Sequence, residues 1–115
     1  MSDVKLTKES EYVLTAMYKE FLDRYNQGVP RDKCKIFGHQ DNILKLVPEI
    51  PEQDIVELIL ELKEKNMVIA SKVSNIYYWV ALTTDSIIFL ENRTSGKISS
   101  VVKALNDLKS LLPKN

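Results

Sequence analysis

Cysteine, glycine and an excess of charge of either sign are scarce or missing in this sequence. The 115 residues include one cysteine, Cys34, so an internal disulfide is excluded, and a lone thiol suits a reducing compartment. Sixteen basic and sixteen acidic side chains cancel, so no global electric field attracts nucleic acid or anionic lipid. A local basic patch could still bind either of them, because the net charge is only a sum.

Long apolar segments are also missing. The longest apolar run, "IVELILEL" at residues 55–62, contains two glutamates and is far too short to span a bilayer. The first residues, "MSDVKLTKESEY", lack the apolar stretch of a secretory signal. The hydrophobic fraction of 44% and the charged fraction of 28% are those of an ordinary globular protein, and 13.2 kDa suffices for one domain. We therefore expect a single soluble domain over residues 1–115, located in the cytoplasm and without a membrane partner.

The periodicity of apolar residues predicts a mostly α-helical chain with one small β-hairpin, an α+β fold. The expected elements are helices at residues 7–28, 39–47, 52–66, 84–93 and 97–112, and a hairpin at residues 67–82. Thr7 and Thr83 are suitable N-caps for the first and fourth helices. Ser74 and Asn75 mark the hairpin turn, because asparagine tolerates a positive φ.

Three helices followed by a hairpin form the outline of a winged helix, here with an additional C-terminal helix. The stretch "ALTTDSIIFLEN" at residues 81–92 resembles the segment that leaves the wing in many bacterial winged helices. "ELILELKEKNMVI" at residues 57–69 resembles the leucine-rich helix, turn and first strand that precede the wing. Over residues 7–112 the chain is similar to the YjcQ-like winged helices of Gram-positive bacteria and their prophages. Ser86 occupies a place where such segments commonly carry glycine. The resemblance implies a non-enzymatic DNA-binding or transcription-regulatory protein.

The predicted third helix is acidic, which argues against insertion into DNA. Residues 49–66 contain six acids and two lysines, a net charge of −4. At about 100° per residue, four of the acids form one stripe opposite the apolar face; these are Asp54, Glu57, Glu61 and Glu64. A winged helix that reads DNA usually lays this helix into the major groove, where carboxylates repel phosphates. The stripe therefore favours a solvated acidic face.

Basic side chains are concentrated elsewhere. Residues 93–115 contain five bases, Lys114 among them, and one acid, a net charge of +4. This segment could contact phosphates, pair with the acidic helix of a second copy, or pair with it within one chain. The candidate nucleic-acid-binding residues are Arg31, Lys33, Lys35, Lys72, Lys97 and Lys103.

The last helix has a wide apolar face for so small a domain. Part of this face must cover the core, and the surplus could be buried against a second copy. The candidate dimer interface consists of Val101, Leu105, Leu108 and Leu112.

Catalytic and metal-binding patterns are missing. Cys34 and His39 lie five residues apart, and no second cysteine or histidine completes a metal site. The sequence has no glycine-rich phosphate loop and no set of nucleophile, base and orienting residue, so we expect no metal, no cofactor and no enzymatic activity. On the hairpin, strict alternation predicts Tyr77 and Trp79 on one face and Tyr78 on the other. The pattern favours a core position for Tyr77 and Trp79, whereas an exposed pair would indicate a protein partner or base stacking.

Two functions of different class remain open at this stage. The first is a winged-helix regulator that contacts DNA through Lys35, Lys72 and the basic terminal helix, as the resemblance implies. The second is a winged helix that serves as a protein-interaction or dimerisation module without DNA binding, as the acidic stripe suggests. The resemblance favours the first, and we adopt it as the working hypothesis from the sequence.

Overall fold

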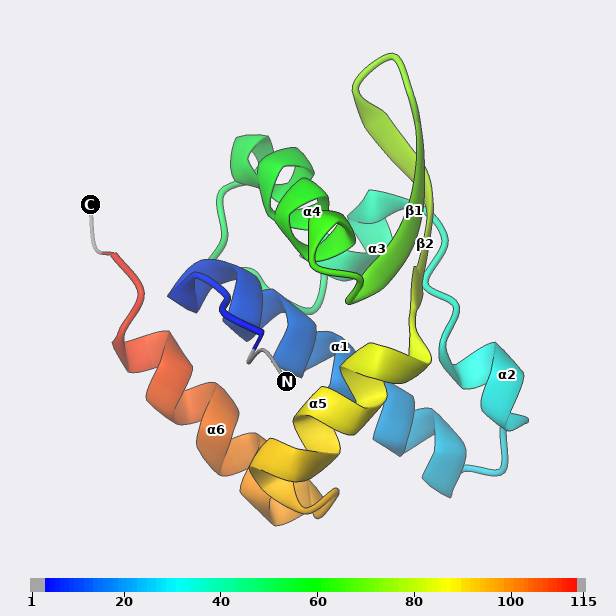
Figure 1. Ribbon diagram of the computed structural model, residues 1–115, viewed down its shortest axis with the longest axis vertical. Coiled ribbons are helices and arrows are strands. Elements are labelled where there is room, and N and C mark those ends of the chain that lie inside the picture. Colours follow the sequence, from blue (N-terminus) through cyan, green and yellow to red (C-terminus); the bar gives the residue numbers. More distant parts are fainter. Residues whose placement is uncertain (1–3, 114–115) are drawn as a thin grey trace.

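Helix α1 (Lys8–Asn26) runs through the centre of the molecule, and most other elements pack against it (Figure 1). The computed structural model describes residues 4–113. The other elements are α2 (Arg31–Cys34), α3 (Gln40–Leu44), η1 (Glu52–Asp54), α4 (Ile55–Glu64), β1 (Val68–Val73), β2 (Ile76–Leu82), α5 (Thr84–Thr94) and α6 (Ile98–Ser110). The fold is therefore mostly helical with one antiparallel hairpin, a winged helix with an additional C-terminal helix.

Helix α1 is buried on several sides. Thr7 caps it as predicted, because its hydroxyl oxygen accepts a hydrogen bond of 3.2 Å from the backbone N–H of Ser10. Helices α2, α4, α5 and α6 all contact α1, so its buried residues lie on more than one face of the helix. Tyr25, near the C-terminal end of the helix, is exposed. The helix ends at Asn26, and Gly28 then adopts a φ of 91°.

The boundaries of the next helices differ from the expectation. The helix predicted at 39–47 spans only Gln40–Leu44, and the ring Nδ1 of His39 caps it by accepting a hydrogen bond of 3.1 Å from the N–H of Asp41. The helix predicted at 52–66 begins as the 3-10 turn η1 after Pro51 and continues as α4, which ends at Glu64. Helix α2 was not predicted, because one turn is too short to show a periodic pattern.

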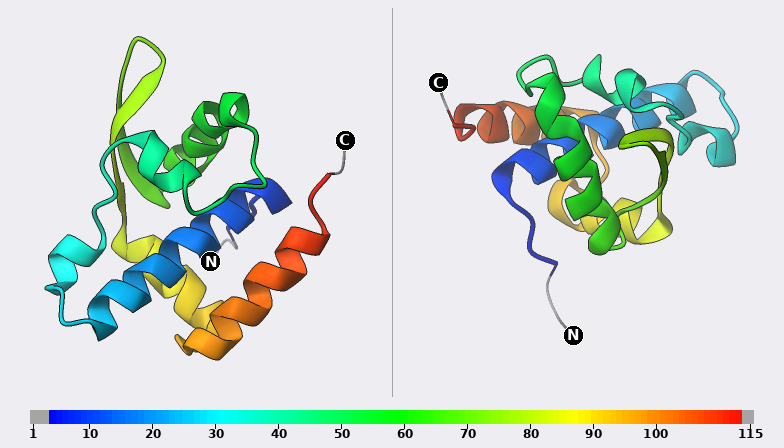
Figure 2. Two further views of the ribbon diagram at one scale, coloured as in Figure 1. Left: turned by 180° about the vertical axis from the view of Figure 1, so that it is seen from behind. Right: turned by 90° about the horizontal axis from the view of Figure 1, so that it is seen from above.

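The wing projects beyond the helical body in Figure 1 and in the left view of Figure 2. Its turn residues Ser74 and Asn75 have φ values of 50° and 66°, the positive values that tight two-residue hairpin turns require. At the base of the wing, Phe37 and Gly38 donate backbone hydrogen bonds to the carbonyl of Val80. The segment before α3 therefore covers the lower part of the β2 edge.

A β-bulge interrupts the wing and corrects the expected alternation. Ser71 pairs with Trp79 and Lys72 pairs with Tyr77, so Tyr78 is the extra residue on β2. Tyr77 is buried, as expected for a core residue, but Trp79 is exposed together with Tyr78. The prediction that Tyr77 and Trp79 share a face was wrong, because the bulge shifts the alternation by one residue.

Thr83 joins the wing directly to α5. Its hydroxyl oxygen accepts a hydrogen bond from the N–H of Ser86 at 3.1 Å, and the same hydroxyl donates to the carbonyl of Asn66 at 2.6 Å. The Ser86 side chain is fully buried and donates to the carbonyl of Thr83 at 2.7 Å. Serine thus fits at this position, because it completes the cap and its φ is not positive.

Helix α6 lies alongside α1 and closes the core (Figure 2). Glu49 links the two helices: its carboxylate accepts a hydrogen bond from the hydroxyl of Tyr12 on α1 and lies 3.0 Å from Lys109 Nζ on α6. The buried apolar residues of α1, α3, α4, α5, α6 and the wing form one cluster. The described residues therefore share one hydrophobic core.

Candidate functional site

Helix α4 corresponds to the helix predicted third, at residues 52–66. Its outward face carries carboxylates. The apolar face predicted for this helix is buried and consists of Ile55, Leu58, Ile59 and Leu62. On the opposite side, Glu57 and Glu64 are exposed, with Leu60 beside them. Glu61 accepts a hydrogen bond of 2.8 Å from the Thr7 hydroxyl. The face that would enter a DNA groove is therefore acidic and apolar.

The side of the wing that points away from the core is apolar. Ile69, Val73, Ile76 and Trp79 are between 41% and 61% exposed, and we call these four residues the outer wing face. The register places them together, because Ser71 pairs with Trp79 and Val73 pairs with Ile76. Ile36, which bridges to Ala81, extends the apolar surface toward the base of the wing.

Charge is missing from the outer wing face. The only charged residue of the two strands is Lys72, and it lies on the core-facing side, where its Nζ is 5.5 Å from the centre of the Tyr77 ring. The attraction of the aromatic ring for the ammonium stabilises this position. Burial raises the pKa of the Tyr77 hydroxyl, and the negative charge of Glu64 raises it further. Tyr77 therefore remains a neutral core residue, and the outer face has no ionic group.

The six predicted nucleic-acid-binding residues do not gather on one face. Arg31, Lys33 and Lys35 belong to α2 and the residue after it, whereas Lys97 and Lys103 belong to the start and middle of α6. Helices α2 and α6 lie on opposite sides of the molecule in Figure 1. Lys72 lies near the tip of the wing, and Lys103 forms an ion pair of 3.0 Å with Asp107. No single duplex surface is thus outlined by these residues.

The predicted dimer residues of α6 are largely used within the chain. Val101 and Leu108 are buried, and Leu105 and Leu112 are half-buried against the same core. The exposed large apolar residues of this region are Val102 and Leu111. The wide apolar face of α6 therefore serves mainly to cover α1.

Acidic and basic segments meet inside the chain. The Glu49–Lys109 ion pair joins the acidic segment to the basic one, which matches the internal alternative among the three left open by the sequence. Arg93 lies 3.4 Å from Glu11 of α1. Lys114, counted in the basic segment, lies outside the described residues.

The side chains that could react or bind a metal have structural roles instead. Cys34 is buried, and its thiol donates to the carbonyl of Val29 at 3.4 Å. His39 caps α3. Within residues 4–113, no three histidine, cysteine or carboxylate side chains come together as a metal site would require. None of the helices in that range has the length and apolar composition needed to cross a membrane.

No family model, curated protein or solved structure matches this chain. The resemblance to YjcQ-like winged helices therefore stays a prediction.

Sequence reasoning did not define the outer wing face, because strict alternation grouped Trp79 with Tyr77 and favoured the core for both. One signal was available. The run "IYYWV" at residues 76–80 has five consecutive apolar residues, and a two-stranded hairpin cannot bury all of them.

Proposed function

We propose that this protein is a non-enzymatic winged-helix module that acts through protein–protein contact, and that it does not insert α4 into a DNA groove. The observation that carries the proposal is the placement of Glu57 and Glu64 on the outward face of α4, next to a wing whose exposed side is apolar. Two like charges 4 Å apart repel by about 1 kcal/mol even in water, so each carboxylate near a phosphate opposes binding. A protein partner, in contrast, is bound by an exposed apolar patch around an aromatic side chain.

The partner we propose for the outer wing face is a second copy of the chain. In a two-fold dimer, each residue of the face meets the same surface of the other copy. A charged residue near the axis would then oppose its own like charge, but the outer wing face has none, because Lys72 points to the core side. The formal net charge of zero removes long-range repulsion between copies. The outer wing face can therefore pack against the same face of a second copy.

Tryptophan fluorescence tests this assignment, because Trp79 is the only tryptophan of the chain and lies within the outer wing face. We expect its emission maximum to shift to shorter wavelength, and its quenching by acrylamide to fall, as the protein concentration rises from low to high micromolar. An emission spectrum and a quenching constant that stay unchanged over this range would overturn the dimer at the wing.

DNA binding is the second candidate function. One observation favours it beyond the winged-helix architecture. Arg31 and Lys33 are both exposed on α2, with Lys35 directly after them, which concentrates three bases within five residues. These residues would contact phosphates without reading bases, so the binding would be weak and steeply dependent on salt.

Fluorescence anisotropy with a random duplex at low and moderate salt decides between the two functions. The protein-contact proposal expects no binding at low salt. Micromolar binding that weakens steeply with salt, and that Arg31→Glu and Lys33→Glu remove, would support the DNA function instead. Both proposals assign the protein to the cytoplasm and give it no catalytic step and no cofactor.

A further inference from the structure

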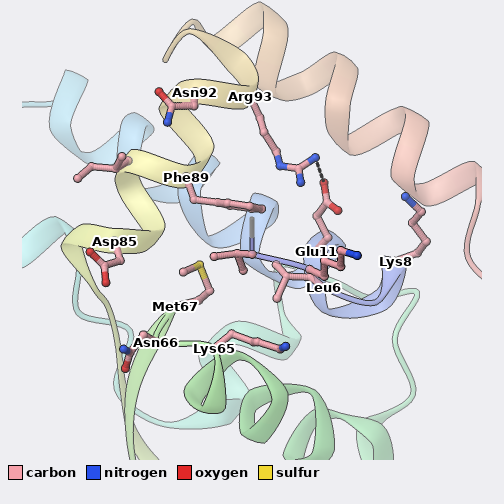
Figure 3. Close-up of a pocket in the computed structure, with 13 residues that line it drawn as sticks. Leu6, Lys8, Glu11, Lys65, Asn66, Met67, Asp85, Phe89, Asn92 and Arg93 are labelled. Atoms are coloured by element: carbon pink, nitrogen blue, oxygen red, sulfur yellow. Dashed lines mark ion pairs between the residues drawn. The ribbon is translucent and has the colours of Figure 1, made fainter. Parts of the chain in front are cut away.

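A groove lies between α5, the end of α4 and the segment that leads into α1 (Figure 3). Its volume is about 1060 Å³. Pockets for small molecules and cofactors usually measure about 300–1000 Å³, so this groove is large enough for a ligand with a long apolar chain. None of the four residues of the outer wing face lines it, and the inference below does not depend on the proposed function.

The floor of the groove is apolar. Leu6, Met67 and Phe89 line it, and Met67 is almost fully buried beneath it. Ile88, which is 49% exposed, and Val4 extend the apolar lining along the groove. An exposed isoleucine next to a half-buried phenylalanine is apolar surface that the folded chain leaves in contact with water. A ligand with an apolar body would remove it from water.

The rim of the groove is basic. Four cations line it, Lys5, Lys8, Lys65 and Arg93, against two carboxylates, Glu11 and Asp85. Four positive and two negative charges give a local excess of two positive charges, in a chain whose formal net charge is zero.

Arg93 holds one end of this rim in place. Its guanidinium lies 3.4 Å from the Glu11 carboxylate and stacks on the Phe89 ring, 4.4 Å from the ring centre. The three lysines form no ion pair with any residue in the range 4–113. Figure 3 shows Lys8, Lys65 and Arg93 toward one end of the groove, together with the Glu11 that pairs with Arg93, and Asp85 toward the other end, so the first end keeps an excess of positive charge. The groove is therefore polarised along its length, with its positive end beside Phe89.

We propose that this groove is a binding site for small amphipathic carboxylates, molecules with an apolar chain and one anionic head group. The chain lies on Leu6, Met67 and Phe89, and the carboxylate lies near Lys8 and Lys65, where the remaining N–H groups of Arg93 are also available. An inorganic anion would leave the apolar floor exposed, and an uncharged hydrocarbon would leave the positive end unpaired. Only a ligand with both parts satisfies both features.

Nuclear magnetic resonance titration of the full chain with decanoate tests the site, at concentrations below micelle formation. We expect saturable shifts of the backbone amide signals of residues 65–67 and 88–93, and unchanged signals in the wing turn at residues 74–75. Decyltrimethylammonium, which has the same chain length and the opposite charge, should produce no saturable shift at these positions. Decyl phosphate distinguishes the head groups: tighter binding than decanoate would assign the site to phosphate esters and overturn the carboxylate assignment.

A pair of charge reversals provides the matched control. Lys65→Glu places a carboxylate on the rim, whereas Lys63→Glu makes the same change two residues earlier, at an exposed position that does not line the groove. Loss of one contact of about 1 kcal/mol corresponds to about a fivefold change in affinity, so we expect Lys65→Glu to weaken decanoate binding at least fivefold. Lys63→Glu should weaken it less than twofold. Equal effects of the two variants, equal binding of the cationic amphiphile, or the absence of saturable shifts would each overturn the proposal.

Discussion

Lys72 lies opposite Tyr77 in the register of the wing, with its ammonium 5.5 Å from the centre of the tyrosine ring. This contact holds the only charged side chain of the two strands on the core-facing side. The bulge at Tyr78, directly before Trp79, turns the indole to the opposite side. The wing therefore has one charged and one uncharged surface, and the uncharged one is exposed. This division, together with the carboxylates on α4, is the basis for proposing protein contact over DNA contact.

Replacement of Trp79 by lysine should abolish self-association through the wing. The change places two like charges opposite one another across the two-fold axis and removes the aromatic anchor, so the dissociation constant should rise at least tenfold. Size-exclusion chromatography with light scattering measures the effect. Leu111→Lys is the matched control, because Leu111 is 58% exposed on the distant end of α6. A dimer that survives Trp79→Lys but not Leu111→Lys would move the interface to α6.

Reversal of the acidic face of α4 should create DNA binding. If Glu57 and Glu64 are what excludes phosphates, the double variant Glu57→Lys/Glu64→Lys should bind a random duplex at low salt while the parent chain does not. Anisotropy of a labelled duplex measures both proteins under the same conditions. Both residues are exposed, so the fold should tolerate the change, which circular dichroism checks. Failure of the double variant to bind would show that the shape of this surface, and not its charge, excludes DNA.

The Tyr12–Glu49–Lys109 contact should make the free energy of unfolding depend on pH in the acidic range. The hydrogen bond from Tyr12 and the ion pair with Lys109 both lower the pKa of Glu49 below its ordinary value of 4.5. A lowered folded-state pKa stabilises the protein fully above the ordinary value, and this stabilisation is lost as the pH falls through the folded-state pKa. We expect Glu49→Gln to cost about 1 kcal/mol at pH 7 and almost nothing at pH 2.

Urea denaturation at both pH values measures this difference in the free energy of unfolding. Glu52→Gln is the control, because Glu52 is an exposed acid that forms no ion pair among residues 4–113. A cost of Glu49→Gln that stays constant from pH 7 to pH 2 would show that the carboxylate charge does not contribute.

Replacement of two adjacent valines on α6 by aspartate should change the stability of the protein by different amounts. Val101 is fully buried against the core and Val102 is 37% exposed. Val101→Asp should destabilise the protein by more than about 3 kcal/mol, because an unpaired charge enters the core, whereas Val102→Asp should cost less than about 1 kcal/mol. Chemical denaturation followed by circular dichroism measures both. Equal, small effects would mean that α6 does not pack on α1 in solution.

The helical order and the caps were predictable because they rest on local chemistry. Thr7 and Thr83 cap their helices as predicted, since a threonine hydroxyl at that position satisfies a backbone N–H of the first turn whatever the rest of the chain does. The hairpin turn was also predictable from local sequence, because asparagine tolerates the positive φ that Asn75 adopts. The buried face of α4 was also predictable, because its apolar residues recur at helical spacing.

The candidate sites were less predictable, because they depend on contacts between distant segments. The bulge at Tyr78 arises from the pairing of two strands, so a single-strand pattern cannot show it. The burial of Val101 depends on α1, which begins about ninety residues earlier, and apolar periodicity does not say which helix covers a face. The groove beside Phe89 combines three separate segments, and no motif in the sequence marks it.

Sedimentation equilibrium of the unmodified chain is the most direct test of the central claim. The monomer has a mass of 13.2 kDa. We expect the weight-average mass to rise toward twice this value between low and high micromolar concentration, and duplex DNA at low salt not to co-sediment with the protein. A mass that stays at the monomer value at every concentration, with DNA sedimenting together with the protein, would exclude self-association and favour the DNA-binding function.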